Sequence, residues 1–407
     1  MTSSAKNNPL SERVINMEES ATIAMAQAAR ELAGQGVQVV NLSVGEPDFT
    51  TPQYIKDAAK SAMDEGYTFY TPVPGYPELR EAIAKKLANE NGIACSKDNI
   101  VVSTGAKQSI ANVILSLINP GEEVVILAPY WVSYADIVKF AGGIPVIVEG
   151  SIENGFKPTT NQIKEAITSK TKAIMFSSPS NPAGAMFSKA ELEALADVVL
   201  DNENVYVLSD EIYEYINYVG GHESIGAIDR VKDRVITING FSKGFAMTGW
   251  RVGYICAPLW LAKATNKIQG QVTSGTCSIA QRASMAAYTD EINRKKSTEE
   301  MRLAYLRRRD LVIGLLKEIP GLITNTPEGA FYVFPDVSAY FGKSTVEGDV
   351  INNATDLSLY LLNKAHVSTV TGVAFGAPTN LRLSFATSDE NIIEAIERIK
   401  NCLKTLS

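Results

Sequence analysis

The sequence has few histidines, few cysteines and no long apolar run, and each shortage excludes a class of protein. Its 407 residues include only two histidines, His222 and His366, which are too few and too isolated for a zinc site or a Ser-His-Asp triad. We expect His222 in a loop and His366 at the end of a helix. We predict no metal site and expect proton transfer by lysine, tyrosine or aspartate. The cysteines lack paired spacing and are expected to be reduced, mostly buried thiols: Cys95, Cys256, Cys277 and Cys402.

Long apolar segments and excess positive charge are also lacking. The longest apolar runs, such as residues 124–128, are too short to cross a bilayer, and residues 1–15 lack the apolar stretch of a secretory signal. A net charge of −7 argues against a nucleic-acid or membrane-surface partner. With 45% hydrophobic and 20% charged residues, the composition is typical of a soluble globular protein. We therefore expect a cytoplasmic protein with small-molecule partners.

Strand-like and helix-like segments alternate through the middle of the chain. This alternation predicts a mostly parallel sheet with helices on both faces, and such sheets bind ligands beyond the carboxyl ends of their strands. From about Ser297 the pattern changes to a long charged helix, short strands and a final amphipathic helix. We predict an α/β fold with a three-layer large domain and a smaller α+β domain. The expected limits are 1–48 for an N-terminal arm and helix packing with the small domain, 49–296 for the large domain and 297–407 for the small domain.

The expected elements can be stated by residue range. Seven strands are expected in the large domain, at 100–103, 123–127, 145–148, 173–177, 205–209, 235–239 and 252–257. Short strands are expected at 39–42, 329–334, 368–370 and 381–385. The expected helices include 17–32, 77–89, 109–118, 189–200, 301–318 and 391–406.

Residues 241–251 carry the most informative pattern. A strand-like run is followed by Ser242, Lys243 and Arg251 among small or apolar neighbours. A lysine in such a pocket loses its proton easily and attacks a carbonyl as a free amine, and a serine with an arginine can hold a phosphate. Pyridoxal 5'-phosphate (PLP) has both groups, and its aldehyde condenses with lysine. Taken alone, Lys243 would be interpreted as one of 38 lysines and arginines, most of them solvated.

Several polar or aromatic residues follow other expected strands. Asp210 ends a buried strand, where a carboxylate usually has a cationic partner, and a pyridinium nitrogen would serve. The alternative is that Asp210 caps a helix. Tyr213 and Asn181 are placed to bond a ring phenolate, and Trp131 can stack on a ring, although an aromatic residue after a strand is more often core.

The segment Gly105-Ala106-Lys107 precedes an expected helix. Small residues at a helix start expose backbone N–H groups and the positive end of the helix dipole, which suits a phosphate. A Gly-Ala pair is weak evidence by itself. Lys107 is either part of a ligand site or a helix-start residue that faces solvent.

In this order and spacing, the motifs resemble those of a class I aminotransferase of the PLP fold-type I superfamily, and in particular the bacterial aspartate aminotransferase subgroup. The resemblance covers the whole chain. It departs from the usual pattern at Ala183, where Thr is common, and at Ser180, where Asn is common. The residues that carry it are 45–49, Tyr70, Gly75, 79–80, 105–108, 129–134, 178–182, 209–213, 242–251 and 380–384.

The resemblance implies a role for each residue that faces the cofactor. Lys243 would bind PLP covalently and move the proton during catalysis, Asp210 would pair with the pyridine nitrogen, and Trp131 would stack on the ring. Tyr213 and Asn181 would bond the ring oxygen. The phosphate would be held by Gly105, Ala106, Lys107, Ser242 and Arg251, and by Tyr70 of a neighbouring subunit, so a homodimer with shared active sites is implied.

The resemblance also implies how an amino acid substrate is held. Asn181 and Arg382 would grip the α-carboxylate, with the Gly45 backbone nearby and Trp131 beside the substrate. Lys107 would bind the distal carboxylate of a dicarboxylic substrate, with Thr22 as a second group there. The implied reaction is PLP-dependent, ping-pong transfer of the amino group of aspartate to 2-oxoglutarate through pyridoxamine phosphate.

Other members of the fold remain alternatives. A prephenate or aromatic aminotransferase keeps the reaction and changes the substrate. A carbon–sulfur lyase or a cyclopropane-forming synthase keeps the cofactor, but Lys107 does not suit its substrates. A PLP-sensing transcription regulator would need an N-terminal DNA-binding domain, and only about 40 residues, which are not basic, precede the Gly45 loop.

Overall fold

A seven-stranded sheet forms the centre of the computed structural model, which describes residues 9–15, 17 and 21–407. The strand order is β2-β8-β7-β6-β5-β3-β4. Strand β8 pairs antiparallel with β2 and β7, and the other neighbours pair in parallel. The strands are β2 (Ile100–Ser103), β3 (Glu123–Ala128), β4 (Ile144–Glu149), β5 (Thr171–Ser177), β6 (Tyr206–Asp210), β7 (Val235–Gly240) and β8 (Gly253–Cys256).

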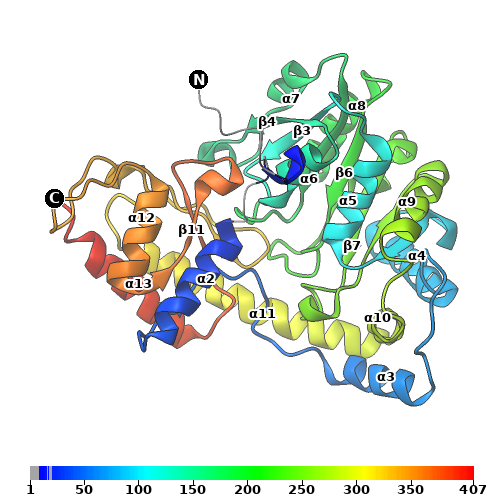
Figure 1. Cartoon of the computed structure of the whole chain (residues 1–407), viewed down its shortest axis with the longest axis horizontal. Coiled ribbons are helices and arrows are strands. Elements are labelled where there is room, and N and C mark those ends of the chain that lie inside the picture. The colour runs from blue at the N-terminus through cyan, green and yellow to red at the C-terminus, as the bar shows by residue number, and fades with distance from the viewer. Residues whose placement is uncertain (1–8, 16, 18–20) are drawn as a thin grey trace.

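Alternating side chains of the strands face two different helical layers. In β5, Ala173 and Met175 pack in one hydrophobic cluster, and Ile174 and Phe176 pack in another. The first cluster includes α5 (Ala106–Leu117), α6 (Ser133–Phe140) and α9 (Leu259–Val272), and the second includes α7 (Thr160–Ala166) and α8 (Lys189–Leu200). Because successive residues of a strand point to opposite faces, the sheet becomes the middle layer of three (Figure 1).

Three further helices pack near strand β2, at one edge of the large sheet. They are α3 (Gln53–Asp64), α4 (Pro77–Asn91) and α10 (Ser278–Thr289). Helix α4 has a proline at its first position, where a missing N–H costs nothing, and ends at Gly92 with φ 69°, which a glycine adopts without strain.

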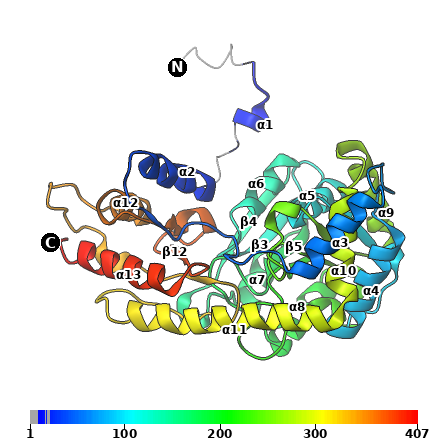
Figure 2. The ribbon, with the colours of Figure 1, turned by 90° about the horizontal axis from the view of Figure 1, so that it is seen from below.

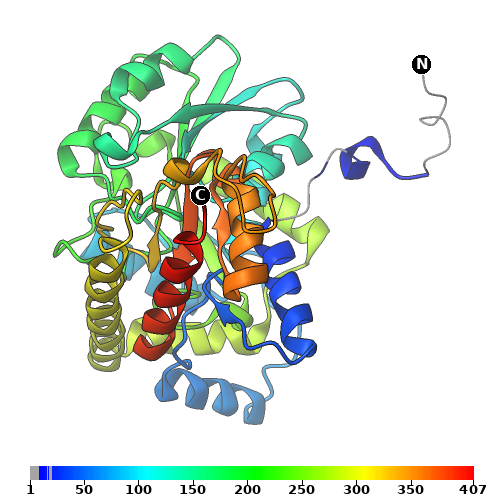
Figure 3. The same cartoon turned by 90° about the vertical axis from the view of Figure 1, so that its left-hand side faces the viewer.

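The C-terminal part forms a smaller sheet with its own helices. Its antiparallel strands are β9 (Tyr332–Val333), β11 (Val370–Thr371) and β12 (Leu381–Ser384), and a separate pair joins β1 (Val40–Asn41) to β10 (Val367–Ser368) in parallel. Figures 1 and 3 show α2 (Ala21–Gly34, blue), α12 (Ala354–Tyr360, orange) and α13 (Asp389–Leu403, red) beside one another there. Figure 2 shows α11 (Glu291–Leu316) running along both parts, and it labels the short α1 (Glu12–Ile15).

The predicted fold class is confirmed, and some predicted element limits are wrong. Helix α11 begins at Glu291 and not at residue 301, because the Asp290 side chain accepts from the Asn293 N–H and caps an earlier start. The predicted domain limit at 296/297 therefore falls inside a helix, and the domain limits remain predictions. The helix expected over 17–32 is observed as α2, and residues 18–20 lie outside the described part.

The expectation for the cysteines is also wrong in part. Only Cys256 is buried, whereas Cys277 is exposed at the start of α10 and Cys95 and Cys402 are partly buried. Of the helices that the structure describes, none combines the length and the apolar character that crossing a bilayer requires.

Candidate active site

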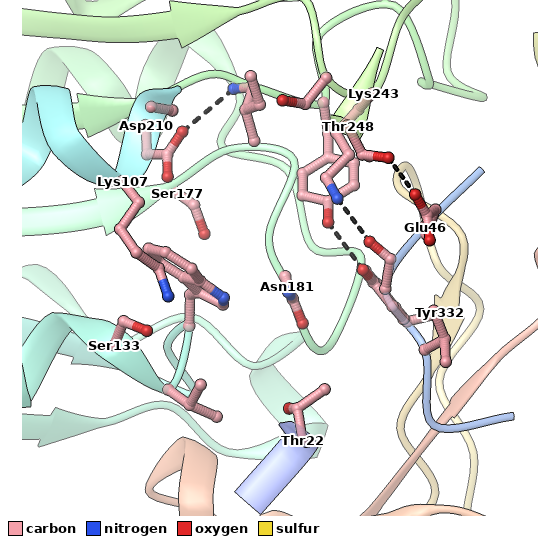
Figure 4. A pocket seen from close by; sticks show the side chains of 18 of the residues that line it. Thr22, Glu46, Lys107, Ser133, Ser177, Asn181, Asp210, Lys243, Thr248 and Tyr332 are labelled. Atoms are coloured by element: carbon pink, nitrogen blue, oxygen red, sulfur yellow. Dashed lines mark hydrogen bonds between the residues drawn. The ribbon is translucent and has the colours of Figure 1, made fainter. Parts of the chain in front are cut away.

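One cavity, of about 360 Å³, collects most of the predicted site residues. It lies at the carboxyl ends of β5 and β6 and the start of α5, where ligands bind to open α/β sheets. Segment 44–46 and strands β9 and β12 close its other side (Figure 4). It is lined by Thr22, Ile23, Val44, Gly45, Glu46, Ala106, Lys107, Trp131, Val132, Ser133, Tyr134, Ser177, Asn181, Asp210, Ile212, Tyr213, Ser242, Lys243, Thr248, Arg251, Tyr332 and Arg382.

Lys243 lies in the turn that follows β7, and its amine points into the cavity (Figure 4). Its Nζ donates a hydrogen bond to the Gly45 carbonyl at 2.5 Å and lies 5.7 Å from the centre of the Tyr213 ring. Burial lowers the pKa of Lys243 to about 8, against the attraction of the Glu46 carboxylate. A lowered pKa makes the neutral amine available near neutral pH, as nucleophilic attack on an aldehyde requires.

Asp210 ends β6 and is nearly inaccessible to solvent. Its carboxylate accepts from the Tyr134 hydroxyl at 2.7 Å and from the Ile212 N–H at 3.2 Å. Burial raises the pKa of Asp210 to about 6, although both hydrogen bonds lower it. The residues after Asp210 form turns and not a helix, so the helix-capping alternative is wrong. A buried carboxylate at a cavity wall, without a cation in salt-bridge contact among the described residues, suits a protonated pyridine nitrogen.

The start of α5 forms a small-residue turn beneath Arg251. Gly105 has φ 84°, and a Cβ there would lie 2.3 Å from Nη2 of Arg251. A Cβ on Gly253 would lie 2.3 Å from the backbone nitrogen of Ala106. Both positions therefore require glycine. Because the first N–H groups of a helix have no acceptor within the helix, this turn, Ser242 and Arg251 together suit a phosphate.

Arg382 lies at the other end of the cavity and is 1% exposed. Its Nη1 donates to Oδ1 of Asn181 at 2.9 Å, and its Nη2 donates to the Ser43 carbonyl at 2.6 Å. Its guanidinium lies 4.6 Å and 5.0 Å from the ring centres of Tyr332 and Phe375. Within residues 9–15, 17 and 21–407, no carboxylate forms an ion pair with Arg382, so its charge is available to a ligand carboxylate.

Lys107 and Thr22 also line the cavity. Nζ of Lys107 lies 4.9 Å from the centre of the Trp131 ring. Partial burial and the nearby Arg251 charge lower the pKa of Lys107. The Lys107 side chain lines the cavity and is also exposed. The structure is therefore compatible with both interpretations of the sequence, a group of the ligand site and a helix-start residue that faces solvent.

Two predicted residues do not line the cavity. Gly105 lies behind Arg251, as described above. Tyr70 is 95% exposed and lies in a separate groove formed by residues 68–71 and 273–278. No second chain is present, so the contact of Tyr70 with a neighbouring subunit stays a prediction.

The sequence reasoning missed several residues of the cavity wall. Tyr134 binds Asp210, Tyr332 binds the Tyr213 hydroxyl at 2.8 Å, and the Glu46 carboxylate accepts from the Thr248 hydroxyl. Tyr134 and Glu46 stand in recognised motifs, but a motif does not tell which of its members face the ligand. The other lining residues that were missed are Ile23, Val44, Val132, Ser133, Ser177 and Ile212.

The fold and the cavity together define a PLP-binding enzyme of fold type I. The chain belongs to the family described as aminotransferase class I and II, whose sequence profile matches residues 37–399. Members of this family are PLP-dependent, so the predicted enzyme class and cofactor are confirmed.

The relatives cover nearly the whole chain. An aspartate/prephenate aminotransferase of Cereibacter sphaeroides is 44% identical over 96% of this chain and 98% of its own length. An aspartate aminotransferase of Geobacillus stearothermophilus is 43% identical over the same shares. A solved structure of the Thermus thermophilus aspartate aminotransferase with maleate is 42% identical, has a TM-score of 0.92 and matches 97% of this chain and 100% of its own.

Proposed function

We propose that this aminotransferase transfers the amino group of aspartate to 2-oxoglutarate and gives oxaloacetate and glutamate. The observation that carries the proposal is the pair of cations, Arg382 and Lys107, which line one cavity and form no ion pair with a carboxylate of the described residues. Two separated cations match the two carboxylates of aspartate, glutamate and their oxo acids. The names of the relatives from Geobacillus stearothermophilus and Thermus thermophilus support the same substrate.

The cavity residues would divide the work around the cofactor. When bound, PLP supplies an electron-withdrawing ring that stabilises the charge left when the Cα proton is removed. Lys243 would hold the cofactor through its amine; once released, that amine would take the proton from the substrate Cα and deliver it to the former aldehyde carbon of the cofactor. Asp210 keeps a positive charge at the ring nitrogen, and Tyr213 and Asn181 donate to the ring oxygen. Trp131 stacks on the ring.

Separate groups would fix the phosphate. The Ala106 N–H, the first of α5, would donate to the phosphate, where the helix dipole also favours an anion. The Gly105 N–H already donates to the Ser103 carbonyl at 2.8 Å, so Gly105 would contribute by leaving room for Arg251. Ser242 adds a hydroxyl and Arg251 a guanidinium, with Lys107 close by. These contacts orient the cofactor and do not take part in proton transfer.

The substrate carboxylates would be held at the two ends of the cavity. Arg382 and Asn181 would bind the α-carboxylate near the Gly45 backbone, and Lys107, with Thr22 as a second group, would bind the distal carboxylate against Trp131. The same arrangement can hold prephenate, which also carries two carboxylates. The name of the Cereibacter sphaeroides relative favours prephenate as a second amino acceptor.

We further propose a cytoplasmic homodimer in which Tyr70 completes the phosphate site of the partner subunit. The domain limits 1–48, 49–296 and 297–407 belong to the same proposal. Dimers mixed from Tyr70→Phe and Lys243→Ala chains would contain one intact site and regain activity. Mixed dimers with no activity above that of the parent variants would overturn the shared site.

An amino acid panel tests the substrate. The PLP-loaded protein is mixed with aspartate, glutamate, alanine or phenylalanine, and the visible absorbance of the cofactor is followed as it converts to the pyridoxamine form. We expect rapid conversion by aspartate and glutamate only. The pyridoxamine form is then mixed with 2-oxoglutarate, oxaloacetate or prephenate to rank the acceptors. Equal conversion by all four amino acids would contradict the dicarboxylate preference.

A further inference from the structure

Tyr332 lies between Arg382, which we assign to the substrate carboxylate, and Tyr213, which we assign to the cofactor. It is fully buried on β9, and β9 pairs with β12, the strand that carries Arg382. The Arg382 guanidinium lies 4.6 Å from the centre of the Tyr332 ring, and the Tyr332 hydroxyl lies 2.8 Å from the Tyr213 hydroxyl (Figure 4). One side chain therefore contacts both the cation of the carboxylate site and a group of the cofactor site.

The third neighbour of Tyr332 is the backbone beside Lys243. A Cβ on Gly45 would lie 2.6 Å from the Tyr332 hydroxyl oxygen, so that hydroxyl packs directly against the glycine. The Gly45 carbonyl accepts from the amine of Lys243. The Tyr332 hydroxyl is thus held in a space with no room for a larger residue at position 45.

We propose that Tyr332 is a positioning residue that holds the Arg382 guanidinium with its ring and orients the Tyr213 hydroxyl with its own. The inference rests on the proposed function, in which Tyr213 donates to the ring oxygen of PLP. Each hydroxyl has one proton to donate. Once Tyr213 donates its proton to the ring oxygen of PLP, it can only accept a hydrogen bond from Tyr332. Tyr332 is then the donor of the pair, and it strengthens the bond that Tyr213 gives.

The Arg382 charge acts on both hydroxyls of the pair. Burial raises the pKa of Tyr213 and of Tyr332, and the adjacent Arg382 charge acts in the opposite direction on the pKa of each. A cation beside the ring makes the phenol a better donor. A substrate carboxylate that neutralises Arg382 would weaken that donor, so Tyr332 links carboxylate binding to the charge on the cofactor ring oxygen.

The hydroxyl and the ring can be tested separately. Tyr332→Phe keeps the ring and removes the hydroxyl, whereas Tyr332→Leu removes both. In the PLP-loaded protein, the visible absorbance changes with pH as the proton between the ring oxygen and the Lys243 nitrogen is lost. Weaker donation by Tyr213 leaves more charge on the ring oxygen, which holds that proton more tightly. We expect Tyr332→Phe to raise the pH midpoint of this absorbance change by about 0.5 to 1 unit, the size expected for one neutral hydrogen bond.

Binding of succinate, a dicarboxylate that cannot be transaminated, reports the contact between the Tyr332 ring and the Arg382 guanidinium. Tyr332→Phe should bind succinate within about twofold of the wild type, because the ring under Arg382 remains. Tyr332→Leu should bind it about five- to thirtyfold more weakly, the loss expected when a buried cation–π contact is removed. The control is Tyr340→Phe, which removes a hydroxyl bound to the Pro320 carbonyl, outside the cavity, and should change neither quantity.

A double variant separates this inference from the proposed function. If Tyr332 acts through Tyr213, then Tyr213→Phe/Tyr332→Phe should have the same midpoint as Tyr213→Phe alone. A wild-type midpoint in Tyr332→Phe, or fully additive shifts in the double variant, would overturn the inference. A wild-type protein that shows no visible band with PLP would instead overturn the proposed function.

Discussion

Two regions of the molecule gather several charged groups, and only one of them pairs its positive charges with carboxylates. The first, which we call the buried ion cluster, consists of Lys86, Glu211, Glu214 and His222. Lys86 binds Glu214, and Nε2 of His222 lies 2.9 Å from Oε2 of Glu211. The second region is the cavity, in which Lys107, Lys243, Arg251 and Arg382 form no ion pair with a carboxylate among the residues that the structure describes.

The balanced region is best explained as support for the turn that follows Asp210. Burial alone lowers the pKa of His222, but the Glu211 and Glu214 carboxylates outweigh it and raise the pKa overall. The ligand atoms of Glu211, Glu214 and His222 lie within 4.8 Å of one another, yet Lys86 already supplies a positive charge there. The cluster therefore contains its own counter-charges, although Nδ1 of His222 has no hydrogen-bond partner among the described residues.

The unbalanced region has the opposite property. Isolated charges are costly when they are removed from water, so the buried Arg382 and the partly buried Lys243, with the more exposed Lys107 and Arg251 on the same cavity, indicate that an anionic ligand completes it. PLP and a dicarboxylate together supply those anions. The comparison teaches that the number of buried charges does not mark a binding site, whereas the lack of partners does.

The largest expected effect is the loss of transamination in Lys243→Ala, a variant of the cavity. A methyl group can neither attack the cofactor nor carry a proton, so aspartate-dependent transamination should fall at least about a thousandfold in a coupled oxaloacetate assay. Lys263→Ala, at an exposed position of α9, is the matched control and should keep wild-type activity. Near wild-type turnover by Lys243→Ala would contradict the assignment.

The second prediction breaks the buried ion cluster. Glu214→Gln removes the close ion-pair partner of the buried Lys86 and leaves only Glu90, at 4.0 Å, so the free energy of unfolding should fall by about 3–5 kcal/mol in guanidinium titrations. Glu299→Gln removes the partner of Arg302 at the surface and should cost at most about 1 kcal/mol. Similar losses in the two variants would show that the cluster is not the structural element proposed here.

The third prediction uses Asp210, the acid of the cavity. In the cofactor-free protein its pKa is about 6, against 3.8 for an ordinary aspartate, so the folded chain binds that proton more tightly than the unfolded chain. The free energy of unfolding should therefore fall by about 3 kcal/mol as the pH rises from about 4 to 6.

The Asp210→Asn variant removes this titration. Urea unfolding at several pH values gives the free energy of unfolding of both proteins. Without cofactor, the wild-type value minus the variant value should fall as the pH rises from about 4 to 6. Bound PLP should abolish it, because a cation at the ring nitrogen lowers the pKa of the carboxyl. A difference that is independent of pH without cofactor would contradict the account.

The smallest effect separates the two carboxylate sites. Lys107→Ala should lower kcat/KM for aspartate and glutamate about 30-fold, which corresponds to about 2 kcal/mol, and leave alanine and phenylalanine nearly unchanged. Arg382→Ala should impair all four amino acids alike, because all share the α-carboxylate. Equal losses for dicarboxylic and apolar substrates in Lys107→Ala would make Lys107 a structural or cofactor residue.

The sequence predicts those parts of the site that depend on short motifs. Ser242, Lys243 and Arg251 are separated by few residues, and Asp210 and Tyr213 follow one strand, so local patterns identify them. The antiparallel direction of β8 was not predicted, because the alternation of strands and helices does not fix the direction of a single strand.

Contacts between distant residues could not be predicted in this way. Lys86 and Glu214 are 128 positions apart, and Tyr213 and Tyr332 are 119 apart. Nothing in their neighbouring residues distinguishes Lys86, Glu214 and Tyr332 from a surface lysine, a surface glutamate and an ordinary core tyrosine. Their roles depend on how the chain brings distant segments together.

The central claim is that the cavity with unbalanced positive charge is the PLP site and that Lys243 holds the cofactor. Borohydride reduction of the PLP-loaded protein fixes the cofactor to its amine, and peptide mass mapping locates it. We predict one cofactor per chain, attached to the peptide that contains Lys243, with no attachment after Lys243→Ala. Attachment at Lys107, or at several exposed lysines with Lys243 unmodified, would contradict the account.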